Sequence, residues 1–533
     1  MTPRRAAAGL AGAAALIAAV TVVSRVVGFG RWLVFSDTVQ ASCLGTAYST
    51  ANMLPNIVFE VVAGGALASA VVPLVGGQLA RGDTAAVRDT ASALLTWVLV
   101  VLVPLAVLAM VLAGPLMGAL VTDPRGCDGA AVTDVARRMF LVFAPQIPLY
   151  GVAVVCGGIL NAHRRFLAAA AAPLVSTVVV ITTYLAFGAG YSGSRNDLAA
   201  VPLRWERTLA FGTTAGVVVL MLTMVVPVLA MRLGLRLSLR FPAGVAPRAR
   251  RLALAGLAGL VAQQLSVLVV ILLANRAGGA LNVYQYAWAV YLVPYAVLAV
   301  PIATSAFTAL SEHAGRDDQV SFGRTASGTT RAVVIASLGG AGVLAGTAAP
   351  VAATFLGVGG RPPAWQLAWA LVAFAPGLLG YGLVAHLGRV LYAQHQGRPA
   401  AVATVTGWVV VTVASVLLVL AVPVGWTVTA IGAANSLGML VAGGLLLVAL
   451  RRYSGAAAVA GVPRAGAAGC AGALVGAVVA ALLASLVRVE GKVANGLLAC
   501  AAAVLAAGLF AAVVLAVDGE DLRALVRRRV TRA

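Results

Sequence analysis

Long apolar stretches recur along the whole chain and are separated by short polar loops. A helix that crosses a membrane needs roughly 20 mostly apolar residues. We expect about fourteen such spans, at residues 9–34, 46–78, 88–118, 134–160, 166–188, 207–232, 252–274, 281–311, 328–356, 364–388, 399–421, 425–450, 465–487 and 494–517. Since no long polar block suggests a separate soluble domain, the pattern predicts an all-α polytopic membrane protein.

The composition supports lipid as the solvent. Of the 533 residues, 61% are hydrophobic and only 10% are charged, whereas a soluble protein carries about 25% charged residues. The net charge is +21, which in a soluble protein would favour nucleic-acid binding. Here the basic residues lie between apolar spans and not in one patch, so we interpret them as determinants of membrane orientation and expect no nucleic-acid partner.

The basic residues are distributed unequally between alternate loops. One side of the expected topology carries 25 of them and the other side carries 8. Loops rich in arginine and lysine stay on the cytoplasmic side. The apolar run that follows Arg4 and Arg5 imitates a signal peptide, but we interpret it as the first, retained span. The pattern thus predicts a multi-pass protein of the cytoplasmic membrane with both termini in the cytoplasm.

Two pairs of segments resemble one another at an offset near 235 residues. Segment 156–165 is similar to 387–396, and segment 54–83 is similar to 293–318. Chance similarity between helices rich in alanine and glycine is the alternative explanation. The repeat predicts two pseudo-symmetric six-helix lobes, at 1–240 and 241–455, followed at 456–533 by two additional helices and a basic tail. Such halves commonly move about a central site near the membrane midplane.

Glu60 is the acidic residue that we place deep inside a span. Asn52, Asn56 and Glu60 follow one another at intervals of four residues, so they share one helix face. Pro55 should kink this helix. A buried carboxylate is costly unless it is neutralised or paired. We favour a cavity-lining role for this polar face over an inert polar contact between helices.

Two arginines lie within the first expected span. Arg25 and Arg31 would point about 120° apart on a straight helix, and Gly28 and Gly30 permit a bend that brings both toward one cavity. Guanidinium groups match phosphate oxygens well, although Arg31 could instead extend to the membrane interface. Because Arg25 and Glu60 both fall near mid-depth of consecutive spans, we also predict an ion pair between them.

Other polar and aromatic positions have two readings. Tyr284, Trp288, Tyr291 and Tyr295 form an aromatic face in the second half, either for packing or for contact with sugar or lipid. Arg137 and Arg138 mark an interface, whereas Gln146, Gln263 and Gln264 line a cavity or join helices. We interpret the five cysteines as small packing residues, with an outer-loop disulfide between Cys43 and Cys127 as the alternative.

The chain carries no recognisable set of catalytic groups. It has no phosphate-binding glycine-rich loop, no cluster of metal-ligand residues and no exposed pair of acids on a long outer loop. We therefore expect no enzyme activity, no cofactor and no metal, and an ATP-driven pump is excluded for this chain alone.

Two motifs resemble those of the MurJ/MviN family of lipid II flippases. Residues 24–31 read Ser-Arg-Val-Val-Gly-Phe-Gly-Arg, and residues 52–56 read Asn-Met-Leu-Pro-Asn, with Glu60 and the pair at 64–65 beyond them. Segments 158–162 and 286–294 follow in the order typical of the family. The resemblance covers nearly the whole chain and is closest to actinobacterial members.

The resemblance implies the multidrug/oligosaccharidyl-lipid/polysaccharide exporter fold and a flippase that works by alternating access. It implies that undecaprenyl-pyrophosphate-linked peptidoglycan precursor is moved to the outer leaflet, that Arg25 and Arg31 meet the pyrophosphate, and that the lipid tail lies along the two C-terminal helices. The chain departs from the family pattern, because Phe59 and Glu60 replace an arginine pair and Trp288-Ala289 replaces an aspartate-arginine pair. Asn52, Asn56 and Glu60 complete the expected substrate-binding set.

Two further functions stay open. The first is an ion-coupled exporter of another lipid-linked glycan or of a drug-like amphiphile, in which Glu60 is the coupling carboxylate. The second is a non-transporting scaffold for cell-wall synthesis. The expected partners are accordingly the lipid-linked precursor, membrane lipids and proteins of cell-wall synthesis.

Overall fold

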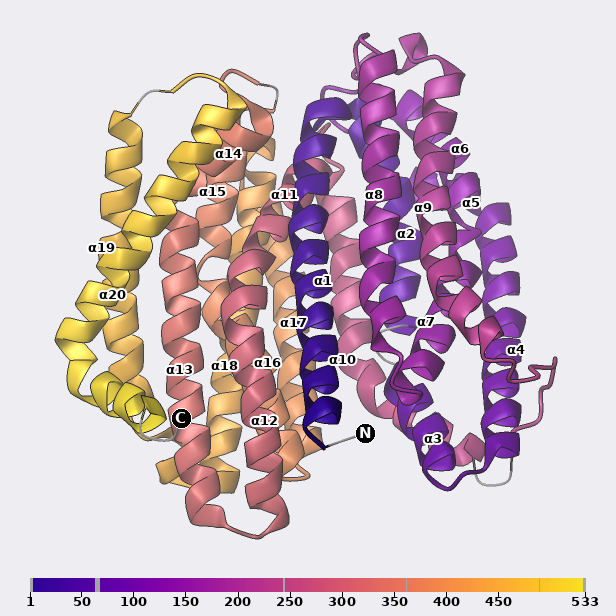
Figure 1. Cartoon of the computed structure of the whole chain (residues 1–533). Helices are drawn as coiled ribbons and strands as arrows, with labels where there is room; N and C mark the ends of the chain where they lie inside the picture. The colour runs from indigo at the N-terminus through magenta and orange to yellow at the C-terminus, as the bar shows by residue number, and fades with distance from the viewer. Residues whose placement is uncertain (1–2, 63–67, 243–244, 361, 488, 531–533) are drawn as a thin grey trace. The chain divides into compact units, whose positions relative to one another are not determined.

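A computed structural model describes residues 3–62, 68–242, 245–360, 362–487 and 489–530 (Figure 1). Within these ranges the chain consists of helices and connecting loops, with one isolated β-bridge between Arg125 and Ala277. The prediction of an all-α protein is confirmed. The helices form two compact units, residues 1–267 with 275–279 and residues 268–274 with 280–533.

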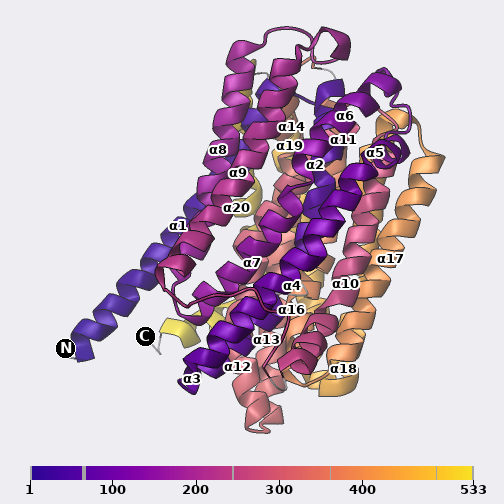
Figure 2. The ribbon, with the colours of Figure 1, turned by 90° about the vertical axis from the view of Figure 1, so that its right-hand side faces the viewer.

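The first unit contains the helices from the N-terminus to the beginning of α10. They are α1 (Pro3–Thr38), α2 (Cys43–Val61), α3 (Ala68–Ala80), α4 (Thr84–Val111), α5 (Ala113–Leu120), α6 (Gly129–Phe143), α7 (Gln146–Ala162), α8 (Phe166–Gly190), η2 (Leu198–Ala200), α9 (Leu203–Ala230) and most of α10 (Val245–Ala274). Helices α1, α8 and α9 lie side by side in this order (Figure 2).

The second unit contains the remaining helices. They are α11 (Ala280–Pro294), η3 (Tyr295–Ala299), α12 (Val300–Gly315), α13 (Gln319–Gly346), α14 (Ala348–Leu356), α15 (Ala364–Phe374), α16 (Gly377–Ala393), α17 (Gly397–Ala421), η4 (Val424–Trp426), α18 (Thr427–Ser454), η5 (Ala456–Val459), α19 (Val462–Leu486) and α20 (Lys492–Val530). Helices α19 and α20 pack against each other and on α13. The three-part division at 240 and 455 stays a prediction.

The membrane spans agree closely with the hydropathy pattern. Twelve described helical segments are long and apolar enough to cross a membrane, and α15 with α16, which meet at 45°, form a thirteenth if they are one bent span. The other predicted span, 46–78, corresponds to α2 and α3, and residues 63–67 between them lie outside the described residues. The total of about fourteen is therefore an approximate match.

The internal repeat reappears in the backbone turns of both units. Gly82 and Asp317, which are 235 positions apart, both adopt the left-handed conformation, with φ of 72° and 56°. Asp83 and Asp318, the next residues, each cap the following helix by accepting a hydrogen bond from the backbone N–H three residues later. Arg164 and His395, 231 positions apart, likewise share a positive φ.

A break in the middle of one helix pair is also repeated. Pro145 separates α6 from α7, and Pro376 separates α15 from α16, because proline cannot donate a backbone hydrogen bond. A hydroxyl from a neighbouring helix supports each break. Thr214 donates to the carbonyl of Val142 at 3.1 Å. Ser436 donates to the equivalent carbonyl, that of Ala373, at 2.6 Å. The two lobes thus share backbone detail as well as helix order.

The structure agrees only in part with the interpretation of the five cysteines as small packing residues. Cys43 and Cys127 form a disulfide, with their Cα atoms 5.7 Å apart, so the reading of these two as simple packing residues is wrong. The N-terminal end of α2 meets the loop before α6, and this proximity is not visible in sequence spacing. Cys156 is a buried free thiol, whereas Cys470 and Cys500 are exposed.

Candidate functional site

The polar face of α2 holds three of the predicted site residues. Asn52 and Asn56 are half-buried, and Glu60 is exposed at the surface of the chain. The helix runs through Pro55 without interruption, so the three side chains keep their common face. The Asn56 side-chain amide donates to the carbonyl of Asn52 at 2.6 Å.

Tyr150 of α7 completes this polar face, and sequence reasoning did not select it. Its hydroxyl donates to Oδ1 of Asn56 at 3.3 Å. Its ring lies against that of Phe59, with 4.4 Å between centroids. Among the described residues, the buried Oδ1 of Asn52 has no hydrogen-bond partner. Such an acceptor is costly to bury unpaired, so the site has spare capacity for a donor.

Arg31 is one of the two arginines predicted for this site. It is half-buried on α1, and its guanidinium lies 4.9 Å from the ring centroid of the neighbouring Trp32.

Arg25 lies six residues before Arg31 on α1. α1 is one continuous helix through Gly28 and Gly30, so the predicted bend is absent and Arg25 and Arg31 stay about 120° apart. Arg25 is exposed. The predicted ion pair with Glu60 is wrong for this structure, because neither residue takes part in an ion pair within the described ranges. The physical reason is that α1 packs along α8.

Aromatic residues close the end of the site nearer the α1–α2 loop. The Tyr48 hydroxyl hydrogen-bonds to those of Tyr184 and Thr213, each at 2.8 Å. Its ring contacts those of Phe35 and Phe143, with centroids 5.5 and 5.6 Å apart. Tyr48 precedes Asn52 by four residues and so belongs to the same helix face. This spacing is the signal by which the sequence could have revealed it.

Other predicted polar residues connect helices within the first unit. Gln146 donates to the Thr214 hydroxyl at 2.8 Å, which supports the reading of a helix-joining residue. Arg138 forms two hydrogen bonds, of 2.9 and 3.0 Å, with the carboxylate of Glu206. Glu206 is only 4% exposed, so Arg138 neutralises a buried acid, and the interpretation of Arg137 and Arg138 as interface markers stays a prediction.

The aromatic face of the second unit serves packing. Tyr291 is fully buried. Its ring lies 5.3 Å from Phe374 and 5.9 Å from Tyr381. Trp288 joins the same cluster, 5.4 Å from Tyr291. These contacts support the packing interpretation over a surface for sugar or lipid.

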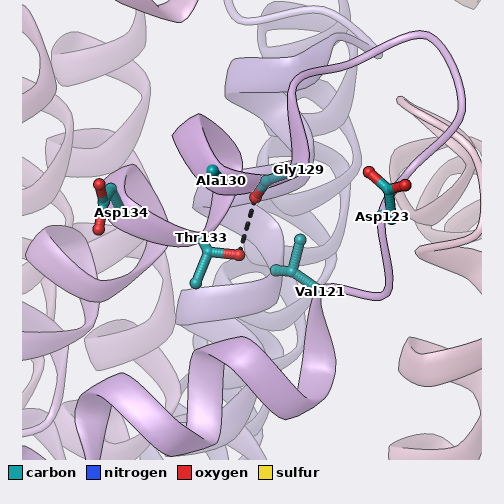
Figure 3. A pocket seen from close by; sticks show the side chains of 6 residues that line it. All are labelled: Val121, Asp123, Gly129, Ala130, Thr133 and Asp134. Carbon is teal, nitrogen blue, oxygen red and sulfur yellow. Dashed lines mark hydrogen bonds between the residues drawn. The ribbon is translucent and has the colours of Figure 1, made fainter.

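A cavity of about 380 Å³ lies near the loop between α5 and α6 (Figure 3). Its charged lining residues are Asp123 and Asp134, which lie on opposite sides of it. Thr133 donates to the carbonyl of Gly129 at 2.8 Å and so satisfies its own hydroxyl. Because an acidic lining repels phosphate groups, this cavity is unsuited to a pyrophosphate.

Comparison with protein families decides the relationship. The family model described as lipid II flippase MurJ matches residues 35–513. This chain belongs to the MurJ family. The match begins after the motif at 24–31, so Arg25 and Arg31 lie outside it, whereas Asn52, Asn56 and Glu60 lie within it.

Curated members of the MurJ family are moderately similar to the chain. A probable lipid II flippase MurJ from Rhizobium tropici is 29% identical over 53% of this chain and 51% of that protein. Another from Rhizobium meliloti (strain 1021) is 30% identical over 54% of this chain and 52% of that protein. The chain thus spans about half the length of the curated relatives it matches.

Solved structures share the fold of this MurJ-family chain. A lipid II flippase MurJ in an inward closed conformation has a TM-score of 0.72 at 16% identity, covering 94% of this chain and 98% of that one. An inward-facing multidrug resistance MATE transporter has a TM-score of 0.66 at 13% identity, covering 83% and 99%. At these identities the likeness shows the fold alone, which is the expected exporter fold.

Proposed function

We propose that this chain is a flippase that moves undecaprenyl-pyrophosphate-linked peptidoglycan precursor, lipid II, across the cytoplasmic membrane. The observation that carries the proposal is the MurJ family match over residues 35–513, on a chain whose helices are long and apolar enough to span a membrane repeatedly. The two pseudo-symmetric lobes suit alternating access, in which the chain needs no catalytic group.

Arg31 is the residue that meets the pyrophosphate. It supplies a half-buried guanidinium on α1, and Asn52, Asn56 and Tyr150 supply a polar face on α2 and α7. Charge-assisted hydrogen bonds from arginine to phosphate oxygens are about twice as strong as neutral ones. The side-chain amide of Asn52 donates to a remaining oxygen. Arg25, exposed about two turns earlier on α1, contacts the headgroup as it enters or leaves.

Both termini face the cytoplasm in this proposal. The basic residues favour one side by 25 to 8, which places those loops inside. The Cys43–Cys127 disulfide lies at the N-terminal end of α2. The basic loop follows α3, after the chain has continued beyond the C-terminal end of α2. Disulfides persist in the oxidising space outside the membrane, so the disulfide and the charge distribution favour the same orientation.

Complementation tests the proposed function. A bacterium depleted of its own lipid II flippase should grow, and should move lipid II to the outer leaflet, when it expresses this chain. Expression level and membrane insertion are measured in parallel. A well-expressed, correctly inserted chain that restores neither growth nor lipid II translocation contradicts the proposal.

An ion-coupled exporter of another amphiphile is the second candidate. Glu60 favours it, because this exposed carboxylate stands where the family resemblance leads one to expect arginine. Drug-efflux measurements on a deletion strain separate the two functions. The variant Arg31→Ala distinguishes a transporter from a scaffold without transport activity. If the chain is only a scaffold, the variant leaves growth and translocation unchanged.

A further inference from the structure

The segment that follows α9 is an extended chain bound along the side of α4. Residues 233–242 carry no helix, although α9 before them is regular (Figure 1). Arg232 and Gly234 adopt positive φ values of 50° and 67°, which turn the chain out of the helix. We call residues 231–242 the α9 extension.

Three hydrogen bonds hold the α9 extension on α4. The backbone N–H of Arg236 donates to the Ser92 hydroxyl, and that of Ser238 donates to the Thr96 hydroxyl, each at 3.0 Å. The Trp97 indole N–H donates to the Leu239 carbonyl at 3.0 Å. The N–H groups of Arg236 and Ser238 thus meet hydroxyls on successive turns of α4. These bonds fix the position of the segment along the helix.

The α9 extension presents both apolar and basic side chains outward. Leu233 and Leu235 pack into the core of the first unit. In contrast, Leu237 is 86% exposed and Leu239 is 54% exposed. A leucine so exposed is unfavourable in water but not at the edge of a bilayer.

The arginines of the segment have no acidic partner among the residues that the structure describes. Arg232, Arg236 and Arg240 are all exposed, and none forms an ion pair with a described residue. Asp89, an acid on the nearby turn of α4, is engaged by Arg88 at 2.8 Å. Three positive charges that form no ion pair with a described residue therefore share this segment with two exposed leucines.

The neighbouring part of α4 exposes apolar side chains. Beyond the last contact with the segment, Val100 and Val101 are about half exposed on a helix that qualifies as a membrane span. Trp97 lies between the two regions, as tryptophan does at bilayer interfaces. The α9 extension therefore lies at the level where acyl chains give way to headgroups, on the side of the chain that carries most basic loops.

We propose that the α9 extension is a binding surface for anionic phospholipids. Arg236 and Arg240 bind the phosphate-bearing headgroups, and Leu237 and Leu239 contact the first carbons of the acyl chains. A bilayer suits this surface better than an acidic protein does, because the exposed leucines adjoin a lipid-facing helix. The proposal concerns a surface apart from the polar face of α2 and does not depend on transport.

The test compares two double variants of the full-length protein. Binding of phosphatidylglycerol and of phosphatidylcholine with the same acyl chains is measured by native mass spectrometry from detergent. R236Q/R240Q should weaken phosphatidylglycerol binding by about fivefold for each arginine replaced. R164Q/R165Q removes the same charge from two exposed arginines of another basic loop and should leave this binding within about twofold of the wild type.

Three outcomes overturn the proposal. Unchanged phosphatidylglycerol binding in R236Q/R240Q shows that the surface is not used, and equal losses in both double variants show an effect of net charge alone. A loss confined to undecaprenyl pyrophosphate, tested at the same concentration, assigns the arginines to a polyprenyl substrate instead. R236K/R240K, which keeps the charge, should retain the binding, and L237S/L239S should weaken it without abolishing the preference for the anionic lipid.

Discussion

The two units place different chemistry on equivalent helix faces. In α2 this face carries Asn56 and Glu60, and in α11 and η3 it carries Tyr291 and Tyr295. In the first unit this face carries amides and an exposed carboxylate. In the second unit it is filled by rings that contact one another and Phe374. The face thus carries polar side chains in the first unit and packed rings in the second.

One pair of equivalent tyrosines shows how this difference arose on a shared backbone. Tyr150 of α7 and Tyr381 of α16 are 231 positions apart. Tyr150 hydrogen-bonds to Asn56, whereas Tyr381 contacts Tyr295 with 4.6 Å between ring centroids. The backbone turns repeat, but the partners across the helices do not. Binding chemistry in this fold is therefore a property of individual side chains and not of the repeat.

Removal of a ring from the second unit should have the largest effect on stability. Tyr291→Ala should lower the free energy of unfolding by about 3–5 kcal/mol, the range found when large buried aromatic side chains are truncated. Asn56→Ala, at the equivalent place in the first unit, should cost no more than about 1.5 kcal/mol. Thermal unfolding of the detergent-solubilised protein measures both. Equal losses would remove the distinction between a packed face and a binding face.

The disulfide should stabilise the first unit alone. Cys127→Ser opens the link between Cys43 and Cys127 and should lower the free energy of unfolding by about 2–4 kcal/mol. A reducing agent should lower the unfolding temperature of the wild type but not that of the variant. Cys470→Ser, at an exposed free thiol of the second unit, is the control. Identical unfolding of both variants and the wild type would contradict a stabilising bond.

Loss of the site cation should impair transport more than stability. Arg31→Ala should slow lipid II translocation in reconstituted vesicles by about ten- to a hundredfold, the value of a hydrogen bond to a charged group. Arg31→Lys keeps the charge but not the two-pronged geometry, so it should be intermediate. Arg207→Ala, at an exposed position of α9, should be active. Full activity of Arg31→Ala would place the pyrophosphate elsewhere.

Loss of the hydroxyl that supports each helix break, at Pro145 and at Pro376, should have a similar effect on stability in both units. Thr214→Val and Ser436→Ala each remove the hydroxyl that donates to a carbonyl beside the break. Each should lower the free energy of unfolding by about 1 kcal/mol. Thermal unfolding under matched conditions checks the pair. A cost several times larger in one unit would show that the repeat does not extend to this detail.

The sequence was most informative where one local property decides the outcome. Hydropathy alone located helices in every predicted span, since lipid leaves a buried backbone few alternatives to a helix. Similar loops at offsets near 235 gave the same turn geometry at Gly82 and Asp317. The interval of four residues placed Asn52, Asn56 and Glu60 on one face because an α-helix repeats every 3.6 residues.

Only the tertiary structure decided which of these residues meet. α1 packs along α8, so Arg25 does not pair with Glu60, although both lie on consecutive spans. Glu206 is buried because Arg138 reaches it from another helix, and Tyr150 joins the site from α7. Hydropathy and spacing are properties of neighbours in the chain, whereas the rotation of each helix is set by contacts between residues far apart in sequence.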